Sequence, residues 1–205
     1  MERAAVTADH AAFTGRLLEQ LRAGCAAEAA TDAIRTYGPE IYALFASIHR
    51  SEQDAGEVFS LFCELLWRGL AGFEGRALFR TWVYTVAWNA SSRFRAQQRA
   101  RLEVLSPDSQ LAVLAEQVRV TTMSRVRREQ RTRIQELRQT LPVEDQMLLI
   151  LRVERELDWL DLVRVIHPDA DFDAAGLTRA SARLRKRFQT VKERLRDLVR
   201  ADAAG

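Results

Sequence analysis

The chain has few of the residues that build metal centres or disulfide frameworks. Its 205 residues include 2 cysteines, Cys25 and Cys63, which share no CxxC or Cys/His spacing. Isolated cysteines argue against a disulfide framework and a structural zinc site, and they fit a reducing compartment. The 3 histidines are also scattered, at positions 10, 49 and 167. We therefore predict no metal site and no cofactor.

Long apolar runs are missing as well. No stretch approaches the roughly 18 apolar residues that a membrane span requires. The N-terminal sequence MERAAVTADHAAF carries acids and a histidine where a signal peptide needs an uninterrupted apolar core. We expect a cytoplasmic protein with no membrane partner.

The sequence also lacks motifs of catalysis. No glycine-rich phosphate loop follows a strand, and neither an HExxH motif nor a paired-carboxylate spacing occurs. Asp169, Asp171 and Asp173 alternate as in a calcium loop, but alanines stand at positions 174 and 180, where that loop needs glycine and glutamate. These acids are expected to favour the start of the next helix instead. We predict no catalytic residue, no enzymatic activity and no small-molecule substrate.

Lysine is scarce, and arginine supplies the basic character. Lys186 and Lys192 are the only lysines among 31 basic residues, and the net charge of +3 accompanies a sequence pI of 9.2. Arginine offers a planar, two-pronged donor to phosphate and guanine. The bias fits a nucleic-acid partner, although a GC-rich genome would produce the same bias.

Apolar residues recur at steps of three and four, which predicts an all-α protein without strands or internal repeats. Helices are expected over residues 9–23, 27–47, 51–70, 79–101, 109–118, 123–140, 143–154 and 157–166, and from 177 onward. Gly38 and Pro39 predict a break or bend in the second helix. Ser51 is a plausible N-cap for the third, and glycines predict a loop near residues 70–78.

Two small helical domains are expected. The segment between them lacks aromatic residues, which is typical of a linker. We assign an N-terminal helical bundle to residues 1–101, a linker to residues 102–124, and a C-terminal domain to residues 125–205. In the first domain, apolar residues cover more than half of the helix over residues 51–70. That helix either has a partner-binding face or lies between its own neighbours.

The helix beginning at Phe79 has two distinct faces. Phe79 and Trp82 lie on the apolar face and are predicted to be core. Opposite them, an arc of roughly 80° holds two aromatics, two arginines and a serine. We call this set the aromatic–basic arc: Arg80, Tyr84, Trp88, Ser91 and Arg95. With Tyr84 and Trp88 facing outward, the arc suits a nucleic-acid strand, since guanidinium groups bind phosphates and rings stack on bases. The alternative is a solvated basic helix end, with Trp88 packed on a neighbour.

The C-terminal domain has the ingredients of a helix-turn-helix: a short apolar helix, a short amphipathic helix, and a long basic one. In that motif the last helix enters the major groove while the preceding helix crosses the backbone. The candidate DNA-binding residues are Arg179, Arg183, Arg185, Lys186, Arg187 and Lys192. The connection over residues 167–176 is longer than the usual turn of three or four residues.

Several motifs, taken in order, resemble a known family. They are TyrGlyProGluIleTyr (37–42), AspAlaGlyGluValPhe (54–59), Trp67, and PheArgThrTrpValTyrThrValAlaTrpAsn (79–89). The chain is similar to a bacterial RNA polymerase sigma factor of the extracytoplasmic-function (ECF) group in the sigma-seventy superfamily. The resemblance covers residues 10–101 and 125–200. In the second range it rests on helix order and on the basic run at 183–188.

The resemblance implies a promoter-specificity factor that binds core RNA polymerase and promoter DNA, and it allows for an anti-sigma factor as a further partner. The third helix would dock on the polymerase through Asp54, Glu57, Ser60, Leu61 and Glu64. The next loop and helix would capture unpaired bases of the minus-ten element through Arg76, Arg80, Tyr84, Trp88, Asn89 and Arg95. The final helix would read the minus-thirty-five element.

The chain departs from the family pattern at a few positions. Ser60 and Leu61 replace a usual Gln-Glu pair, and Trp88 stands where a basic residue is common. Two other hypotheses therefore stay open. One is a helix-turn-helix regulator that acts without polymerase; the other is a degenerate sigma-like module that binds only protein.

Overall fold

The computed structural model describes residues 2–49, 51–100, 117–119, 133–168 and 170–203. All regular structure over these ranges is helical, which confirms the all-α prediction. The predicted helix over 109–118 lies outside the described residues except at its end. The same holds for most of the linker, for the first part of the helix expected over 123–140, and for Asp169.

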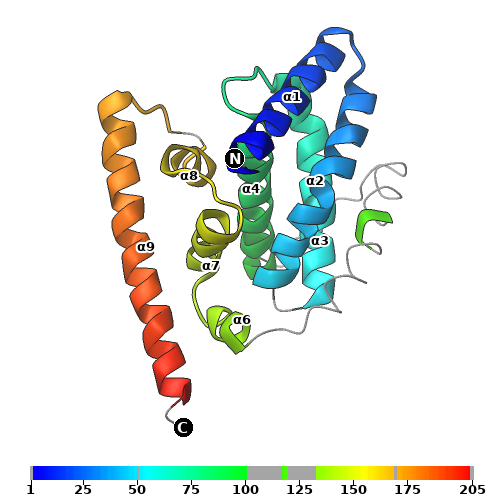
Figure 1. Cartoon of the computed structure of the whole chain (residues 1–205). Helices are drawn as coiled ribbons and strands as arrows, with labels where there is room; N and C mark the ends of the chain where they lie inside the picture. The colour runs from blue at the N-terminus through cyan, green and yellow to red at the C-terminus, as the bar shows by residue number, and fades with distance from the viewer. Residues whose placement is uncertain (1, 50, 101–116, 120–132, 169, 204–205) are drawn as a thin grey trace.

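The elements in chain order are α1 (Glu2–Arg22), α2 (Ala26–Ile48), α3 (Glu52–Gly69), the 3-10 turn η1 (Leu70–Gly72), α4 (Phe79–Ala100), α6 (Arg133–Arg138), α7 (Val143–Leu149), the π-helical turn η2 (Ile150–Glu154), α8 (Trp159–Ile166) and α9 (Ala174–Ala203). Helices α1–α4 form one bundle, and α7 and α8 lie between that bundle and the long α9 (Figure 1). We call residues 2–100 the N-terminal half and residues 133–203 the C-terminal half.

The core of the N-terminal half is built from aromatic and aliphatic side chains of α2, α3 and α4. Phe45, Phe59, Phe62 and Phe79 are almost completely buried, which confirms Phe79 as a core residue. Trp82 is half-buried and packs against this core, with its ring centroid 5.3 Å from that of Phe79. Burying rings of this size is the main favourable contribution to folding.

Helix α2 runs without interruption through Pro39, so of the predicted break or bend the break does not occur. The glycine before it has a packing role instead. A Cβ atom on Gly38 would lie 3.0 Å from Cγ1 of Val118. Val118 follows α4 in the sequence, so this contact joins two distant segments of the chain. Gly38 therefore permits a close approach between helix and side chain rather than a turn.

Helix α3 lies between its own neighbours, as one of the two expectations for its broad apolar surface states. Its inner side is buried between α2 and α4. Its outer side leaves Leu61 and Leu65 half-buried and Trp67 40% exposed. The helix is thus central to the bundle and still presents apolar surface to solvent.

The helix ends are fixed by side-chain caps, some local and one from a distant helix. Ser51 Oγ accepts a hydrogen bond from the Asp54 backbone N–H at 2.9 Å, as predicted. Asp173 Oδ1 accepts from the Gly176 N–H at 2.6 Å, which confirms the expected capping of the last helix. At the start of α4, the Phe79 N–H donates to Thr14 Oγ1 of α1. Each bond satisfies a donor that a helix N-terminus leaves unpaired.

The segment predicted as one helix over residues 143–154 has two parts, α7 and the π-helical turn η2. It ends in a bond from the Leu157 N–H to the carbonyl of Leu151, six residues earlier, with Glu156 at a φ of 55°. Glu156 thus has the left-handed backbone conformation in which glycine is usual after a helix. The resulting tight turn directs residue 155 toward α4.

The His49 imidazole is a buried base that makes stability depend on pH. Burial lowers its pKa from 6.5 to about 4, and its ring contacts Ser91 Oγ at 3.2 Å. The unfolded chain therefore binds a proton between these pH values while the folded chain does not. We expect the free energy of unfolding to fall as pH drops from 6.5 toward 4, by up to about 1.4 kcal/mol per pH unit.

Chemical denaturation across this pH range should give a flatter profile for His49→Gln. His167→Gln is the control, because His167 is exposed and its pKa is lowered less far. Equal slopes for wild type and His49→Gln would rule out this histidine as the source.

Candidate nucleic-acid interface

The aromatic–basic arc of α4 is covered by α2 and by the C-terminal half of the chain. Helix α8 packs along α4, and α7 packs against α2. The Arg80 and Arg95 side chains keep only 20% and 21% of their exposed area, while Tyr84 and Ser91 keep none. In this arrangement the arc is an intramolecular interface rather than an open surface.

At one end of the arc, the Glu40 carboxylate of α2 gathers three partners. Its Oε1 atom accepts hydrogen bonds from Arg80 Nη2 at 3.0 Å and from the Tyr84 hydroxyl. Arg155 Nε, from the turn after η2, lies 3.7 Å from the same oxygen. Arg80 also donates through Nη1 to the Arg155 carbonyl at 3.1 Å. One carboxylate thus connects α2, α4 and the C-terminal half.

This cluster is not fully satisfied. The Nε atoms of Arg80 and Arg155 are buried without a hydrogen-bond partner among the described residues. Arg80 and Arg155 are both cations, and Glu40 is their shared counter-charge. Half-buried ion pairs of this kind contribute up to about 1 kcal/mol each, and an unpaired buried donor subtracts from that.

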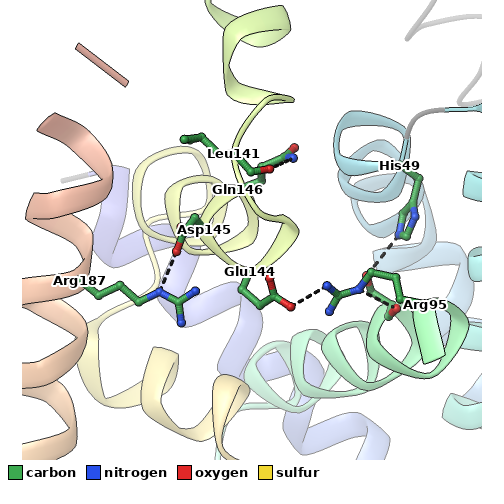
Figure 2. A network of polar contacts seen from close by, with 8 residues as sticks. His49, Arg95, Leu141, Glu144, Asp145, Gln146 and Arg187 are labelled. Atoms are coloured by element: carbon green, nitrogen blue, oxygen red, sulfur yellow. Dashed lines mark hydrogen bonds and ion pairs between the residues drawn. The ribbon is translucent and has the colours of Figure 1, made fainter. Parts of the chain in front are cut away.

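At the other end of the arc, two consecutive acids at the start of α7 bind arginines on opposite sides (Figure 2). Glu144 Oε1 accepts from Arg95 Nη1 of α4 at 2.6 Å, and Asp145 Oδ1 accepts from Arg187 Nε of α9 at 2.7 Å. Burial opposes ionisation of Glu144, but the hydrogen bond and charge of Arg95 outweigh it and hold the pKa of this carboxyl below its usual value. Glu144 is therefore the anion that neutralises Arg95.

Tyr84 does not face outward, so that part of the prediction is wrong. Its side chain is fully buried, whereas Trp88 is half-buried against the core and Asn89 is half-buried. The projection around a single helix assumed one buried side. Helix α4 is buried on two sides, because residues far along the chain cover the arc.

The loop over residues 70–78 forms one wall of a hollow of about 240 Å³ beside the arc. Phe73 lines it from the loop, Thr81, Trp82 and Thr85 line it from α4, and Arg164 lines it from α8. Arg76 also borders this hollow, although it is exposed and paired with Glu74. Loop, ring and guanidinium thus lie together, but the ring is Trp82, which was predicted to be core, rather than Tyr84 or Trp88.

The proposed polymerase-binding residues share the outer side of α3. Asp54, Glu57, Ser60 and Leu61 are half-buried, and Glu64 is buried and paired with Arg68 at 2.8 Å. A hollow of about 410 Å³ runs along this side, lined by Glu52, Gln53, Gly56, Glu57, Ser60 and Arg119. Among the described residues, the elements that contact α3 most extensively are α2 and α4, not those of the C-terminal half.

The basic side of α9 is open to solvent. Arg179, Arg183, Arg185, Lys186 and Arg187 are exposed, and Lys192 is half-buried. Some of them already have protein partners. Arg185 lies over the Trp159 ring at 5.7 Å, Lys192 lies over the Phe188 ring at 5.0 Å, and Arg187 binds Asp145. Among the described residues, Arg179, Arg183 and Lys186 are the members of this set with no such ring or ion-pair partner.

Residues that the sequence did not single out complete the site. Glu40, Glu144 and Arg155 contact the arc from α2 and from the C-terminal half. Only Glu40 carried a local signal, since it lies within the motif at 37–42. The positions of Glu144 and Arg155 depend on tertiary packing, which periodicity does not reveal.

The described residues contain no group of three histidines, cysteines or acids that could hold a metal ion. Among the same residues, no helix is long and apolar enough to cross a membrane.

An all-helical fold with a basic, aromatic α4 and a basic α9 defines a candidate nucleic-acid-binding protein. Residues 33–101 match the family model described as Sigma-70 region 2. The matched segment begins within α2 and includes α3 and α4, about a third of the chain. No curated protein matches the chain. The match shows that this segment is similar to Sigma-70 region 2.

Because Tyr84 is buried, its replacement should affect folding. Tyr84→Phe removes the donor to Glu40 and should lower the free energy of unfolding by about 1 to 3 kcal/mol. Tyr84→Ala also removes the ring and should cost about 3 to 5 kcal/mol. Denaturant titration measures both values. Wild-type stability of Tyr84→Ala would contradict the buried position.

Proposed function

We propose that this protein is a promoter-specificity factor of the sigma-seventy superfamily, from the extracytoplasmic-function group. It binds core RNA polymerase and directs initiation at promoters with minus-ten and minus-thirty-five elements. Residues 1–101 act as the polymerase-binding and melting domain, residues 102–124 as a linker, and residues 125–205 as the helix-turn-helix domain. The observation that carries the proposal is the Sigma-70 region 2 match over residues 33–101.

Polymerase binding is assigned to the outer side of α3. Glu57 and Ser60 border a hollow there, and half-buried Leu61 and Leu65 add apolar surface beside them. A surface of mixed acidic and apolar character can dock a helical partner whose own surface is basic and apolar. The exposed ring of Trp67 extends this surface toward the end of the helix.

Strand capture is assigned to α4 and the loop before it. An unpaired base needs an apolar or aromatic surface for stacking, and its backbone needs cations. The hollow beside Trp82 supplies the first, while Arg76, Arg80 and Arg95 supply the second. Base capture of this kind offsets an unstacking cost of a few kcal/mol per base. The protein needs no chemistry of its own for this function.

Duplex reading is assigned to the first half of α9. Arg179, Arg183 and Lys186 lie at spacings of four and three residues, so they share one side of the helix. That side is exposed, as groove binding requires. The turn before α9 is long for this motif, and Asp173 defines where the helix begins.

Glu57→Arg should abolish co-purification with sigma-free core polymerase, because it places a cation in the acidic part of the docking side. Glu19→Arg on α1 is the matched control, since Glu19 is exposed and lies outside this side. Start-site mapping with the same proteins on genomic DNA tests the whole proposal. Duplex binding without any polymerase association would instead identify a helix-turn-helix regulator.

Arg183→Ala should weaken binding to promoter duplex and flatten the dependence of log K on log[salt] by about one unit. Fluorescence anisotropy over a salt series measures both quantities. Arg200→Ala removes the same charge near the far end of α9, where Arg200 is exposed and paired with Asp197. Equal effects of the two substitutions would argue against groove recognition by the first half of α9.

A further inference from the structure

Helix α1 lies outside the segment that matches Sigma-70 region 2, yet it contacts the start of α4. The match begins at residue 33, whereas α1 ends at Arg22. Within the N-terminal half, α1 packs against both α2 and α4. Polymerase docking, strand capture and duplex reading are assigned to α3, α4 and α9, so α1 has no role among them.

The N-terminus of α4 is capped by α1 rather than by its own sequence. Leu78, the residue before α4, has no polar side chain that could accept a hydrogen bond from the first turn. The buried Thr14 hydroxyl takes this part, since its Oγ1 accepts from the Phe79 N–H at 3.0 Å and donates to the His10 carbonyl at 2.8 Å. The first turn of α4 is therefore held where α1 places it.

The loop before α4 also rests on α1. Gly75 has a φ of 75°, and a Cβ atom at this position would lie 2.9 Å from Cδ1 of Leu18. Glycine, which has no Cβ, allows the loop backbone to come this close to the leucine. Leu18 is half-buried and packs against the core, so the loop has a packed side chain behind it.

Both contacts lie next to the hollow of about 240 Å³ to which strand capture is assigned. Glu74 and Arg76, the neighbours of Gly75, line this hollow, and so do Thr81 and Trp82 in the first turn of α4. A shift of the loop or of that turn changes the shape of the hollow. A pocket that is already in its binding shape binds more tightly, because less ordering is needed on binding.

An aromatic cluster extends the contact from α1 to the ring that lines the hollow. The Phe13 ring centroid lies 5.7 Å from that of Phe79, and the Phe79 centroid lies 5.3 Å from that of Trp82. Phe73 contacts the same two rings, at centroid distances of 5.1 and 5.5 Å. The orientation of Trp82 is thus coupled to α1 through packed rings.

We propose that α1 positions the strand-capture hollow, with Thr14 and Leu18 as positioning residues. Thr14 fixes the start of α4, and Leu18 sets the path of the loop at Gly75. The described residues that line the hollow include neither of them, so both act through residues that do. The proposal rests on the proposed function, because it concerns the same strand-binding site.

Thr14→Val keeps the size of the side chain but cannot accept from the Phe79 N–H. We expect it to weaken binding of the full-length protein to a labelled pool of random single-stranded DNA oligonucleotides by about three- to tenfold, because the hollow is less often in its binding shape. Thr14→Ser keeps the hydroxyl and should bind within about twofold of wild type. Fluorescence anisotropy measures these affinities. Wild-type affinity of Thr14→Val would overturn the role of Thr14.

The salt dependence separates positioning from charge. Thr14→Val removes no cation, so the slope of log K against log[salt] should keep its wild-type value. Arg76→Ala removes a cation that borders the hollow, so it should weaken binding and also flatten the slope by roughly 0.7 units. A flattened slope for Thr14→Val would mean that a phosphate contact is lost and would overturn positioning.

Ile48→Val is the control for a general loss of stability. Ile48 is buried at the end of α2, next to His49, whose ring contacts that of Phe94 far from the start of α4. It should lower the free energy of unfolding but leave strand affinity unchanged at a temperature where all variants are folded. Equal losses of strand affinity in Ile48→Val and Thr14→Val would attribute the effect to stability and overturn the proposal.

A double-mutant cycle tests the contact behind the loop. Gly75→Ala places a Cβ atom against Leu18 and should weaken strand binding by about tenfold. Leu18→Ala removes the atoms that this Cβ would meet, so the double variant should bind more tightly than the product of the two single effects predicts. Effects that simply multiply would overturn the role of Leu18.

The same variants distinguish failure of the positioning role from failure of the proposed function. Binding that weakens with Arg76→Ala but not with Thr14→Val would overturn positioning and leave strand capture in place. Wild-type protein that binds no strand, or binds it equally well without Arg76, would overturn strand capture and positioning together. Association with core polymerase should be normal in every variant, because the hollow on the docking side of α3 is lined by none of these residues. Loss of that association in Thr14→Val would show a general defect and overturn the specific role of α1.

Discussion

The arrangement of the whole molecule depends on the small number of carboxylates that pair with the arginines of α4. Glu40 serves Arg80 and Arg155 together, and Glu144 serves Arg95. In water each guanidinium is hydrated, so covering it costs free energy unless an acid replaces the water. The C-terminal half can rest on α4 only because it brings Glu144 and a backbone carbonyl to these positions.

The same constraint explains why Tyr84 is buried beside the cation Arg80. Its hydroxyl bonds to Glu40, and the Arg80 guanidinium lies over its ring, with the Cζ atom 5.4 Å from the ring centroid. A ring with a polar tip can enter a core when that tip finds a partner. Glu40 provides that partner, so an aromatic residue on a basic helix face becomes part of the interior.

Periodicity predicted most of the helices because their signals are local. Phe79, Ser51 and Asp173 could be assigned from a few neighbouring residues, and their positions are confirmed. The errors arise where distant segments meet. Gly38 faces Val118, and the C-terminal half covers the helix that carries Tyr84. A sequence read one helix at a time contains no information about which second surface will cover a helix. The binding roles of the arc, α3 and α9 stay predictions.

The adjacent acids at the start of α7 have an evolutionary consequence. Glu144 is tied to a residue 49 positions earlier, and Asp145 to one 42 positions later. A change of sign at either acid leaves its arginine without a counter-charge, and only a second change on a different helix restores the pair. Among relatives that keep this packing, positions 144 and 95 should covary, and so should 145 and 187, while 144 and 145 drift independently of one another.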